Sequence, residues 1–461
     1  MRGRGRLDPL YPSPHARIRS ITQTNVPVKG RKEGKLSKTK LLYIGDYSNT
    51  GFGTVSKGLL RGLHATGEYE ILQMGINWFD IDPFDEPWDI IPAAFSGLRS
   101  REIVTEDPYG FERVSYFLNK FDPDIVFINN DYMVARSYMV DDKGQPTRLA
   151  NHRSIKVLYA PVDSEPVPDY YVNVAKMFDL NIAYTHWQRL MFAEHDPIFS
   201  LMPVLYHGYD SATLAPMDKT LAKQALVEAL VTKNDGEGRE LFAERILNSW
   251  IVYFVGANQF RKDIPCLFRA FAKLNEDIPE ASLIVHANSI PQGESGWHLS
   301  NLQKLTGVER SILMIRANVY TPEEMNLFYN AADVLAYPTR GEGFGLPSLE
   351  AMAVKTPVAA TAFGPQLELH NRGRGYLVDF IDVIAGTGPA WSYFVLPDYR
   401  SLHSKLKFIH DNPDHVAETV ERAYETFKSF TWENQANQLH DILSKIPRNT
   451  DANDIQAQET D

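Results

Sequence analysis

The most informative segment of the sequence is residues 333–353, Asp-Val-Leu-Ala-Tyr-Pro-Thr-Arg-Gly-Glu-Gly-Phe-Gly-Leu-Pro-Ser-Leu-Glu-Ala-Met-Ala. A short apolar run precedes a glycine-rich turn and a helical pattern, and open α/β sheets bind ligands outside the carboxyl end of such a strand. Gly341, Gly343 and Gly345 let a ligand approach the backbone closely, and Pro347 suits the first position of a helix. The start of that helix would direct free N–H groups and a positive dipole end at an anion, most naturally a diphosphate.

The same stretch carries two carboxylates. Glu342 falls on the turn and Glu350 just inside the helix, so we expect both to face one crevice from different heights. A plainer interpretation of this isolated pair stays open, in which Glu350 only caps the helix or faces solvent.

A second glycine turn follows the first apolar run, in Asp46-Tyr-Ser-Asn-Thr-Gly-Phe-Gly-Thr-Val-Ser56. Gly51 and Gly53 precede a helical apolar pattern, which again predicts a strand, a turn and a helix start suited to an anion. The turn lacks the third glycine of the dinucleotide fingerprint, and Asn77 stands where that fingerprint has an acidic residue. Taken alone, the turn indicates no particular ligand.

Two adjacent cations follow the first apolar run of the second half, in Val255-Gly-Ala-Asn-Gln-Phe-Arg-Lys-Asp263. Arg261 and Lys262 lie where the ligand crevice of that half should open, and two cations can neutralise a diphosphate and the charge of a leaving group. Considered alone, the dipeptide is also compatible with a solvated surface pair.

After residue 38 the chain alternates short apolar runs with amphipathic segments, the pattern of parallel sheets covered by helices on both faces. The strands expected in the first half are Lys40–Asp46, Tyr69–Asn77, Ile125–Asn130, Lys156–Asp163, Asn181–His186 and Val204–His207. Those expected in the second half are Trp250–Asn258, Ala281–Asn288, Ile312–Val319, Asp333–Thr339, Pro357–Gly364 and Gly375–Asp379. Two such sets predict two Rossmann-like domains in tandem, with a hinge at residues 207–216.

Composition sets the broad class. The 461 residues are 44% hydrophobic and 23% charged, and with no apolar run near the roughly 18 residues of a spanning helix they predict a soluble globular protein. Collagen, coiled coil, membrane channel and wholesale disorder are excluded. The single cysteine, Cys266, cannot form an internal disulfide, which favours a cytoplasmic setting.

Charge is unevenly distributed. Residues 1–40 carry eleven Lys and Arg against Asp8 and Glu33, a charge of +9, whereas the whole chain has a net charge of −11. An acidic body argues against a broad nucleic-acid surface. We expect residues 1–38 to form a disordered basic arm, either a solvated tail or a contact to phosphate-rich lipid or nucleic acid.

In this order and spacing, the three segments resemble glycosyltransferase family 4, the retaining nucleotide-sugar transferases of the GT-B architecture, over roughly residues 40–446. Glu342-Gly-Phe-Gly-Leu-Pro-Ser-Leu-Glu350 looks like the family's E-x7-E motif, and Asn258–Asp263 like its basic phosphate-binding turn. His207-Gly-Tyr-Asp210 is similar to the family's H-G-V-D crossover, and Phe430-Thr-Trp-Glu433 to the opening of its terminal helix. The resemblance implies an α/β fold of the GT-B class, with two Rossmann-like domains facing each other across a cleft.

The resemblance also implies a domain organisation. The expected parts are the basic arm 1–38, an N-terminal acceptor domain 39–212, a C-terminal nucleotide-sugar domain 213–429, a terminal helix 430–446 that returns to the first domain, and a polar tail 447–461.

By the same resemblance, particular residues have particular roles. Glu342 would lie against the donor sugar and the reacting centre, and Glu350 would bind the ribose hydroxyls. Arg261 and Lys262 would hold the diphosphate. Further donor contacts are implied for Gly51, Gly53, Gly343, Phe344, Gly345 and Leu346. Transfer would retain the anomeric configuration by front-face attack, with the leaving phosphate taking the acceptor proton.

The acceptor side departs from the family. Many members carry a histidine where this chain has Asn129-Asn130-Asp131, and many have an arginine where this chain has Ala257, which shifts the phosphate role onto Arg261. Asn130 and Asp131 are therefore candidate acceptor residues. Asp163, after another strand of the first domain, could also face the acceptor, or cap a turn.

No metal or other cofactor is expected besides the donor substrate. Asp80-Ile-Asp82 and Asp122-Pro-Asp124 spell D-x-D, but one lies in a proline-rich loop and the other precedes a strand. The expected partners are a nucleotide sugar and an acceptor glycan, lipid, protein or modified nucleic-acid base. Two alternatives stay open: a catalytically silent sugar-nucleotide-binding scaffold, and another two-Rossmann enzyme such as a sugar-nucleotide epimerase.

Overall fold

The computed structural model describes residues 38–78, 85–94, 107–233, 239–288, 296–316, 320–385 and 393–446. The expected polar tail, and the expected basic arm apart from its last residue, lie outside these ranges. None of the helices in the described part of the chain is both long enough and apolar enough to cross a membrane.

The first domain is built on a parallel sheet in the order β3-β2-β1-β4-β5-β6. Its strands are β1 (Thr39–Asp46), β2 (Tyr69–Ile76), β3 (Asp89–Pro92), β4 (Ile125–Asn129), β5 (Ile155–Tyr159) and β6 (Leu180–Ile182). Leu41 and Tyr43 of β1 belong to one buried cluster and Leu42 and Ile44 to another, because successive side chains of a strand point to opposite faces. Both faces of this sheet are therefore buried.

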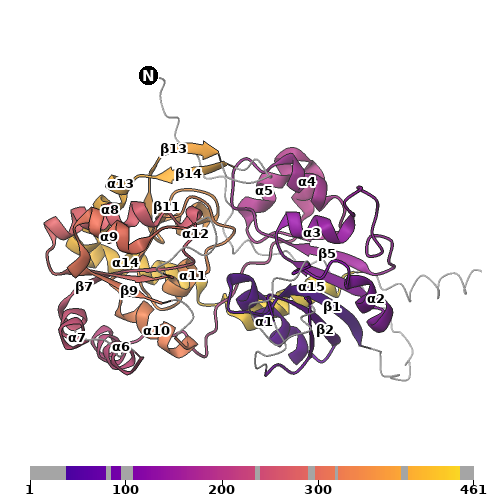
Figure 1. Cartoon of the computed structure of the whole chain (residues 1–461), viewed down its shortest axis with the longest axis horizontal. Coiled ribbons are helices and arrows are strands. Elements are labelled where there is room, and N and C mark those ends of the chain that lie inside the picture. Colours follow the sequence, from indigo (N-terminus) through magenta and orange to yellow (C-terminus); the bar gives the residue numbers. More distant parts are fainter. Residues whose placement is uncertain are drawn as a thin grey trace, which may run out of the picture. The chain divides into compact units, whose positions relative to one another are not determined.

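Helices cover both faces of the first sheet. On one face lies α1 (Gly51–Ala65), whose apolar side chains share a cluster with Leu41. The other face carries α2 (Val114–Phe121), α3 (Tyr132–Met139), α4 (Asp169–Ala175) and α5 (His186–His195), the last three above the sheet in Figure 1.

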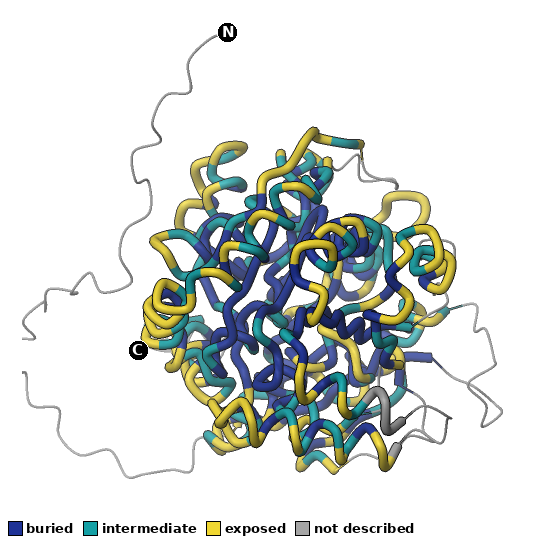
Figure 2. Tube along the Cα trace, turned by 90° about the vertical axis from the view of Figure 1, so that its left-hand side faces the viewer, coloured by how far each residue is buried: buried dark blue, intermediate teal, exposed yellow. Residues whose placement is uncertain are grey.

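The second domain repeats this plan with the sheet order β12-β11-β10-β7-β8-β9. Its strands are β7 (Trp250–Val255), β8 (Ala281–His286), β9 (Ile312–Ile315), β10 (Val334–Tyr337), β11 (Val358–Thr361) and β12 (Tyr376–Val378). One face is covered by α8 (Ile264–Asp277), α9 (Leu299–Thr306) and α13 (Tyr399–Asp411), the other by α6 (Lys219–Lys233), α7 (Arg239–Asn248) and α10 (Pro322–Ala331) (Figure 1). The remaining helices are α11 (Leu346–Ala353), α12 (Pro365–His370), α14 (Pro413–Phe427) and α15 (Trp432–Leu443). The prediction of two parallel α/β domains is confirmed, and Figure 2 shows their strands as a dark blue interior.

Val204–His207 is not a strand of the first sheet, contrary to the sequence prediction. Val204 makes only an isolated bridge to the end of that sheet. The Tyr206 hydroxyl instead donates to Glu368 of the second domain, and the His207 ring packs on both Tyr184 of the first domain and Phe344 of the second. This segment therefore serves as the crossing between the two domains. The sixth place in the sheet is taken by β3, whose four residues are too short a run to stand out in the sequence.

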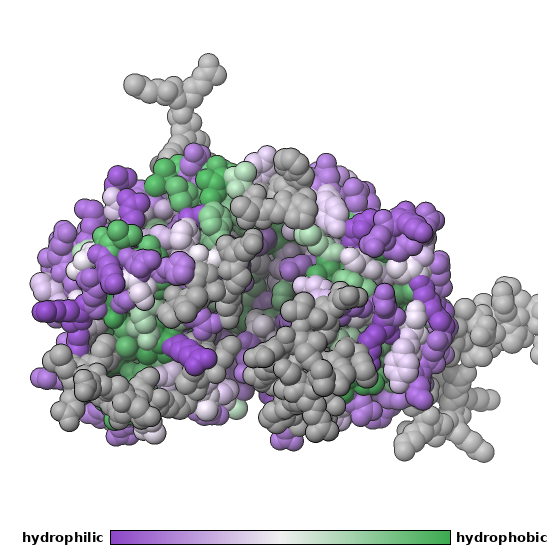
Figure 3. Space-filling view, viewed as in Figure 1, coloured by the Kyte–Doolittle hydropathy of each residue, from purple (hydrophilic) through white to green (hydrophobic). Residues whose placement is uncertain are grey.

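A two-stranded antiparallel hairpin, β13 (Phe380–Ala385) and β14 (Tyr393–Pro397), follows β12 and was not expected. Four of its large apolar side chains are 39–56% exposed: Phe380, Ile381, Val383 and Tyr393. Figure 3 shows a green patch where Figure 1 labels the hairpin. Strands were expected at the continuous apolar runs that are typical of buried strands. β13 is exposed on both faces, so it does not follow that pattern.

The helix α15 packs on α1 of the first domain. A Cβ added at Gly58 would overlap the indole of Trp432, and one added at Gly62 would overlap Ala436. The close approach of the two helices therefore requires glycine at these two positions of α1.

Candidate functional site

The turn after β7 positions two cations at the carboxyl end of the second sheet. Phe260–Lys262 form a single 3-10 turn, which ends at Asp263 in the left-handed region with φ 39°. The Asp263 carboxylate accepts a hydrogen bond from the Cys266 N–H at 3.3 Å and so caps α8. This tight turn places Arg261 and Lys262 in the connection between β7 and α8, just before the helix begins.

A buried ion pair fastens this turn to the loop after β10. The Arg340 Nε donates to the Asp263 carboxylate at 2.9 Å, and the Arg340 guanidinium lies 3.9 Å from the centre of the Phe260 ring. The Arg340 N–H also donates to the carbonyl oxygen of Arg261 at 2.7 Å. These contacts hold the cations beside residues 341–346, which we call the glycine loop.

Arg261, Lys262 and Glu342 form one cluster. The Arg261 guanidinium and the Lys262 ammonium both donate to Oε1 of Glu342, at 2.7 and 2.5 Å. Lys262 Nζ also donates to the hydroxyl of Tyr337 at 2.7 Å. The side chains of Lys262 and Glu342 are each 6% exposed, whereas that of Arg261 is 32% exposed. The guanidinium is thus the part of the cluster that an incoming anion meets first.

The protonation states of the cluster depend on one another. Burial lowers the pKa of Lys262 to about 8, although the Glu342 carboxylate opposes this shift. Burial also disfavours the Glu342 carboxylate, but the two cations outweigh it and lower the pKa of Glu342. At neutral pH the cluster holds two positive charges and one negative charge.

Two helix N-termini meet near this cluster. Gly345, with φ 96°, precedes α11, and Pro347 occupies its first turn. In the first domain, the hydroxyl of Thr50 accepts from the Gly53 N–H at 3.0 Å and caps α1. A Cβ at Gly51 would lie 4.0 Å from the Leu346 side chain, so the first turns of α1 and α11 approach each other from different domains. Both dipoles favour an anion there.

Glu350 lies one turn further along α11, and its polar contact is with Tyr329 rather than with the cluster of Arg261, Lys262 and Glu342. The hydroxyl of Tyr329 donates to its carboxylate at 2.5 Å. Burial raises the pKa of Glu350, and this hydrogen bond opposes the shift. Glu350 as a residue is half-buried.

Two carboxylates of the first domain approach the cluster. Burial raises the pKa of Asp163. The charge of Arg261 opposes this shift and that of Glu342 adds to it, so Asp163 lies close to both. Asp131, at the start of α3, has its pKa raised to about 6 by desolvation and by Asp163. Asp131 is exposed to solvent, and Asp163 is half-buried. Asn130 is buried, and its side chain accepts from the Asp131 N–H at 2.9 Å.

The glycine loop touches the first domain closely. A Cβ at Gly341 would overlap the carbonyl oxygen of Asp163, and one at Gly343 would overlap Pro161. Glycine is required at these positions by the close approach of the two domains. Phe344 is 2% exposed, and its ring lies 4.5 Å from the ring of His207, measured between centroids, so this side chain packs in the interior.

Several residues of the site were missed in the sequence. Asp263 and Arg340 stand directly beside the motifs used in the sequence analysis. No pattern in the sequence indicates that these two residues form an ion pair with each other. Tyr337 ends β10 one turn before the loop. Glu368, which contacts the first domain, lies outside every motif that the sequence analysis used.

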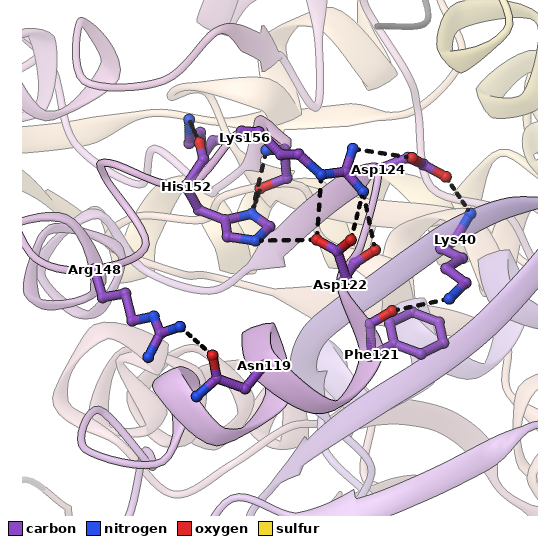
Figure 4. A network of polar contacts seen from close by, with 10 residues as sticks. Lys40, Asn119, Phe121, Asp122, Asp124, Arg148, His152 and Lys156 are labelled. Atoms are coloured by element: carbon purple, nitrogen blue, oxygen red, sulfur yellow. Dashed lines mark hydrogen bonds and ion pairs between the residues drawn. The ribbon is translucent and has the colours of Figure 1, made fainter. Parts of the chain in front are cut away.

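The two D-x-D sequences lie elsewhere. Asp80 and Asp82 are outside the described residues. Asp122 and Asp124, both labelled in Figure 4, lie at the amino end of β4, the edge opposite the glycine turn of this sheet. There they pair with Arg153, at 3.0 and 3.5 Å. Asp124 also accepts from the backbone N–H of Lys40. Within the described residues, no group of three or more His, Cys, Asp or Glu could hold a metal ion.

Sequence comparison relates the second half of the chain to glycosyltransferases. Residues 239–385 match the family model described as "Glycosyl transferases group 1". The chain is 31% identical over 206 residues to a D-inositol 3-phosphate glycosyltransferase of Corynebacterium urealyticum, covering 44% of each chain. It is 30% identical over 231 residues to the protein of that name in Kineococcus radiotolerans, covering 49% of this chain and 47% of the relative. The matches thus span less than half the length of these relatives.

Structure comparison extends over both domains. Sucrose-phosphate synthase of Thermosynechococcus elongatus superposes with a TM-score of 0.66 at 18% identity, covering 89% of this chain and 99% of that one. Anabaena HepE in complex with UDP-glucose gives 0.62 at 15% identity, covering 88% and 100%. WaaG, a glycosyltransferase involved in lipopolysaccharide biosynthesis, gives 0.60 at 14% identity, with the same coverage. These likenesses establish the GT-B fold for the chain.

Proposed function

We propose that this protein is a retaining glycosyltransferase of the family 4 type, which transfers a sugar from a nucleotide-diphosphate sugar to an acceptor held by the first domain. The observation that carries the proposal is the cluster of Arg261, Lys262 and Glu342 beside the first turn of α11. Two cations and two helix N-termini converge there, and a diphosphate leaving group needs that charge. The similarity of residues 239–385 to group 1 glycosyltransferases supports the same reaction class.

In the proposed reaction, the bond between the anomeric carbon and the diphosphate breaks while the acceptor oxygen bonds to the same face of that carbon. The acceptor proton passes to the leaving phosphate. Arg261 and Lys262 neutralise the charge that develops on the phosphate. Glu342 accepts hydrogen bonds from both cations, which keeps them charged and in position. In the proposed reaction it would lie at the reacting centre.

The nucleoside and the acceptor would occupy separate ends of the site. Glu350 would accept hydrogen bonds from the ribose hydroxyls while Tyr329 holds its other side. A uridine nucleotide is the first to test, because HepE, which shares the fold, is complexed with UDP-glucose. Asp131 and Asp163 would accept hydrogen bonds from acceptor hydroxyls. Because two cations already supply the positive charge, we propose no metal cofactor.

A thermal-shift screen of nucleotide diphosphates and their sugars tests the donor assignment. A ligand at 100 times its dissociation constant stabilises the folded state by about 2.7 kcal/mol, which is well above the resolution of the assay. The matched control is the double variant Arg261→Ala with Lys262→Ala, which should lose the shift. Retention would then be read from the anomeric proton coupling of the product by NMR.

No stabilisation by any nucleotide diphosphate would refute the proposal. Stabilisation without transfer to any acceptor would instead identify the silent scaffold, and donor consumption without acceptor would identify an epimerase-like reaction.

A further inference from the structure

Glu368 reaches from the second domain to a helix of the first. Its carboxylate accepts hydrogen bonds from the backbone N–H groups of Trp187 and His186, at 2.7 and 3.3 Å, at the start of α5. The hydroxyl of Tyr206, in the crossover between the domains, donates to the same carboxylate. Glu368 is 8% exposed, so these bonds are shielded from water. A charged group that receives three donors across a domain boundary is a strong connection.

The carboxylate adds to a cap that α5 already has. The hydroxyl of Thr185 accepts from the Gln188 N–H at 3.1 Å, which satisfies one of the free N–H groups of the first turn. Glu368 satisfies two others and places its negative charge at the positive end of the helix dipole. The first turn of α5 is therefore completed by a residue of the other domain.

The same short helix, α12, also holds the glycine loop. The side-chain amide of Gln366 donates to the carbonyl oxygen of Phe344 at 2.7 Å, and its Oε1 accepts from the hydroxyl of Ser348 at 2.8 Å. A Cβ at Gly345 would overlap the Gln366 amide, so loop and side chain are in direct contact. Two residues of α12, spaced two apart, thus contact the first domain and the glycine loop.

The far end of α12 is fixed as well. Arg374 Nη2 donates to the backbone carbonyl of Glu368 at 2.5 Å and to the side chain of Asn371 at 2.6 Å. On the other side of the loop, the Phe344 ring packs on His207 of the crossover. α12 is therefore held at its end. A displacement of Glu368 would move the helix and, through Gln366, the glycine loop.

We propose that Glu368 is a positioning residue, which sets the glycine loop in register with the first domain by joining α12 to the start of α5. The inference rests on the proposed function, because only there does the position of the glycine loop matter: it places Glu342 and the start of α11 opposite the acceptor candidates Asp131 and Asp163. Glu368 itself touches neither donor nor acceptor. Its effect on transfer passes through Gln366 and the loop.

Hydrogen–deuterium exchange tests the connection without any substrate. The variants are Glu368→Ala, which removes all three hydrogen bonds, and Glu368→Gln, which keeps the length of the side chain and one acceptor oxygen. The matched control is Glu425→Gln, which alters a surface pair with Lys428 in the same domain. In Glu368→Ala we expect amide exchange to accelerate at least tenfold both in residues 186–190 and in residues 341–348. Glu368→Gln should show a smaller change in both, and the control none.

Each other outcome overturns the inference. Faster exchange confined to residues 186–190 would mean that Glu368 only caps α5. Unchanged exchange in both segments would mean that the hydrogen bonds of Glu368 stabilise neither of them. Faster exchange throughout the second domain would mean that Glu368 serves its folding.

Kinetics supply a second measurement on the same variants. We expect kcat to fall at least tenfold in Glu368→Ala and less in Glu368→Gln. The dissociation constant for the nucleotide diphosphate alone should stay within threefold, because the charged side chains proposed to hold it, Arg261, Lys262 and Glu350, all belong to the second domain. An equal loss of affinity and kcat would contradict a positioning role. If the wild type transfers no sugar, the proposed function fails, and the exchange experiment still decides the role of Glu368.

Discussion

Replacing Glu342 by glutamine removes one negative charge from between two cations and preserves the size of the side chain. In the wild type one oxygen of this carboxylate accepts from Arg261 at 2.7 Å and from Lys262 at 2.5 Å. Hydrogen bonds to charged groups contribute about 1.5–3 kcal/mol each, and a buried pair that loses one partner costs about 3–5 kcal/mol. We therefore expect the free energy of unfolding of Glu342→Gln to fall by about 3 kcal/mol at pH 7.

The loss of stability depends on pH with a definite sign. Folding lowers the pKa of Glu342 from its ordinary value of 4.5, so its stabilisation is present above that value and disappears as pH falls through the folded-state pKa. Urea unfolding curves of wild type and variant should therefore differ at pH 7 and converge in strong acid.

Catalysis should suffer for the same reason. If about 3 kcal/mol of transition-state stabilisation is lost, kcat falls roughly 100-fold, since each 1.36 kcal/mol is about tenfold in rate. Lys262, with a pKa of about 8, must stay protonated to hold the leaving phosphate, so wild-type transfer should decline as pH rises through about 8. Without the Glu342 carboxylate that pKa falls further, and the decline should begin at lower pH in the variant.

The assay is the release of nucleotide diphosphate across pH 6–9. It uses saturating donor to obtain kcat, and donor well below KM to obtain the pH profile of kcat/KM, which reports pKa values of the unliganded enzyme. Circular dichroism confirms the fold. A kcat within threefold of wild type, together with an unshifted pH profile, would refute the role assigned to Glu342.

Four further outcomes follow from the site. Arg261→Ala combined with Lys262→Ala should weaken nucleotide diphosphate binding by at least roughly 100-fold in calorimetry, since two charge-assisted hydrogen bonds are lost, and unchanged affinity would contradict the phosphate assignment. Glu350→Ala should raise the donor KM roughly tenfold with little change in kcat, and a kcat loss like that of Glu342→Gln would show that the two carboxylates share one role. Chelators should leave transfer largely intact, whereas a full loss restored by a divalent ion would reveal a metal requirement. Deleting residues 1–38 should leave kcat and KM unchanged, and a loss confined to low salt and to acceptors carried on liposomes or DNA would instead show recruitment by the basic charges.

Much of the fold could be predicted because buried parallel strands are short, continuous apolar runs. β1, β7 and β10 follow this rule, and the glycine turns after β1 and β10 mark where helices begin. The rule fails for elements that are not buried on both sides. β3 is four residues long, and β13 is exposed on both faces, so neither has the pattern that identifies the others.

Candidate residues of the site could be named for a similar reason. In a parallel sheet the carboxyl ends of all strands lie at one edge, so residues that follow β7 and β10 in the sequence must gather there. Arg261, Lys262 and Glu342 were found in this way. Their pairing was not, because both cations compete for one oxygen atom, and this depends on how the two turns pack through Arg340 and Asp263.

The positions of most buried strands along the chain, the glycine turns and the charges that follow them could be predicted from sequence, since these depend on neighbouring residues. Two other features are visible only in the folded chain: Asp163 lies against Gly341, and Glu368 completes the first turn of α5, 181 residues away from Trp187 along the chain. The physical reason is that such contacts form between surfaces assembled from many segments, and no local pattern specifies which surface faces which.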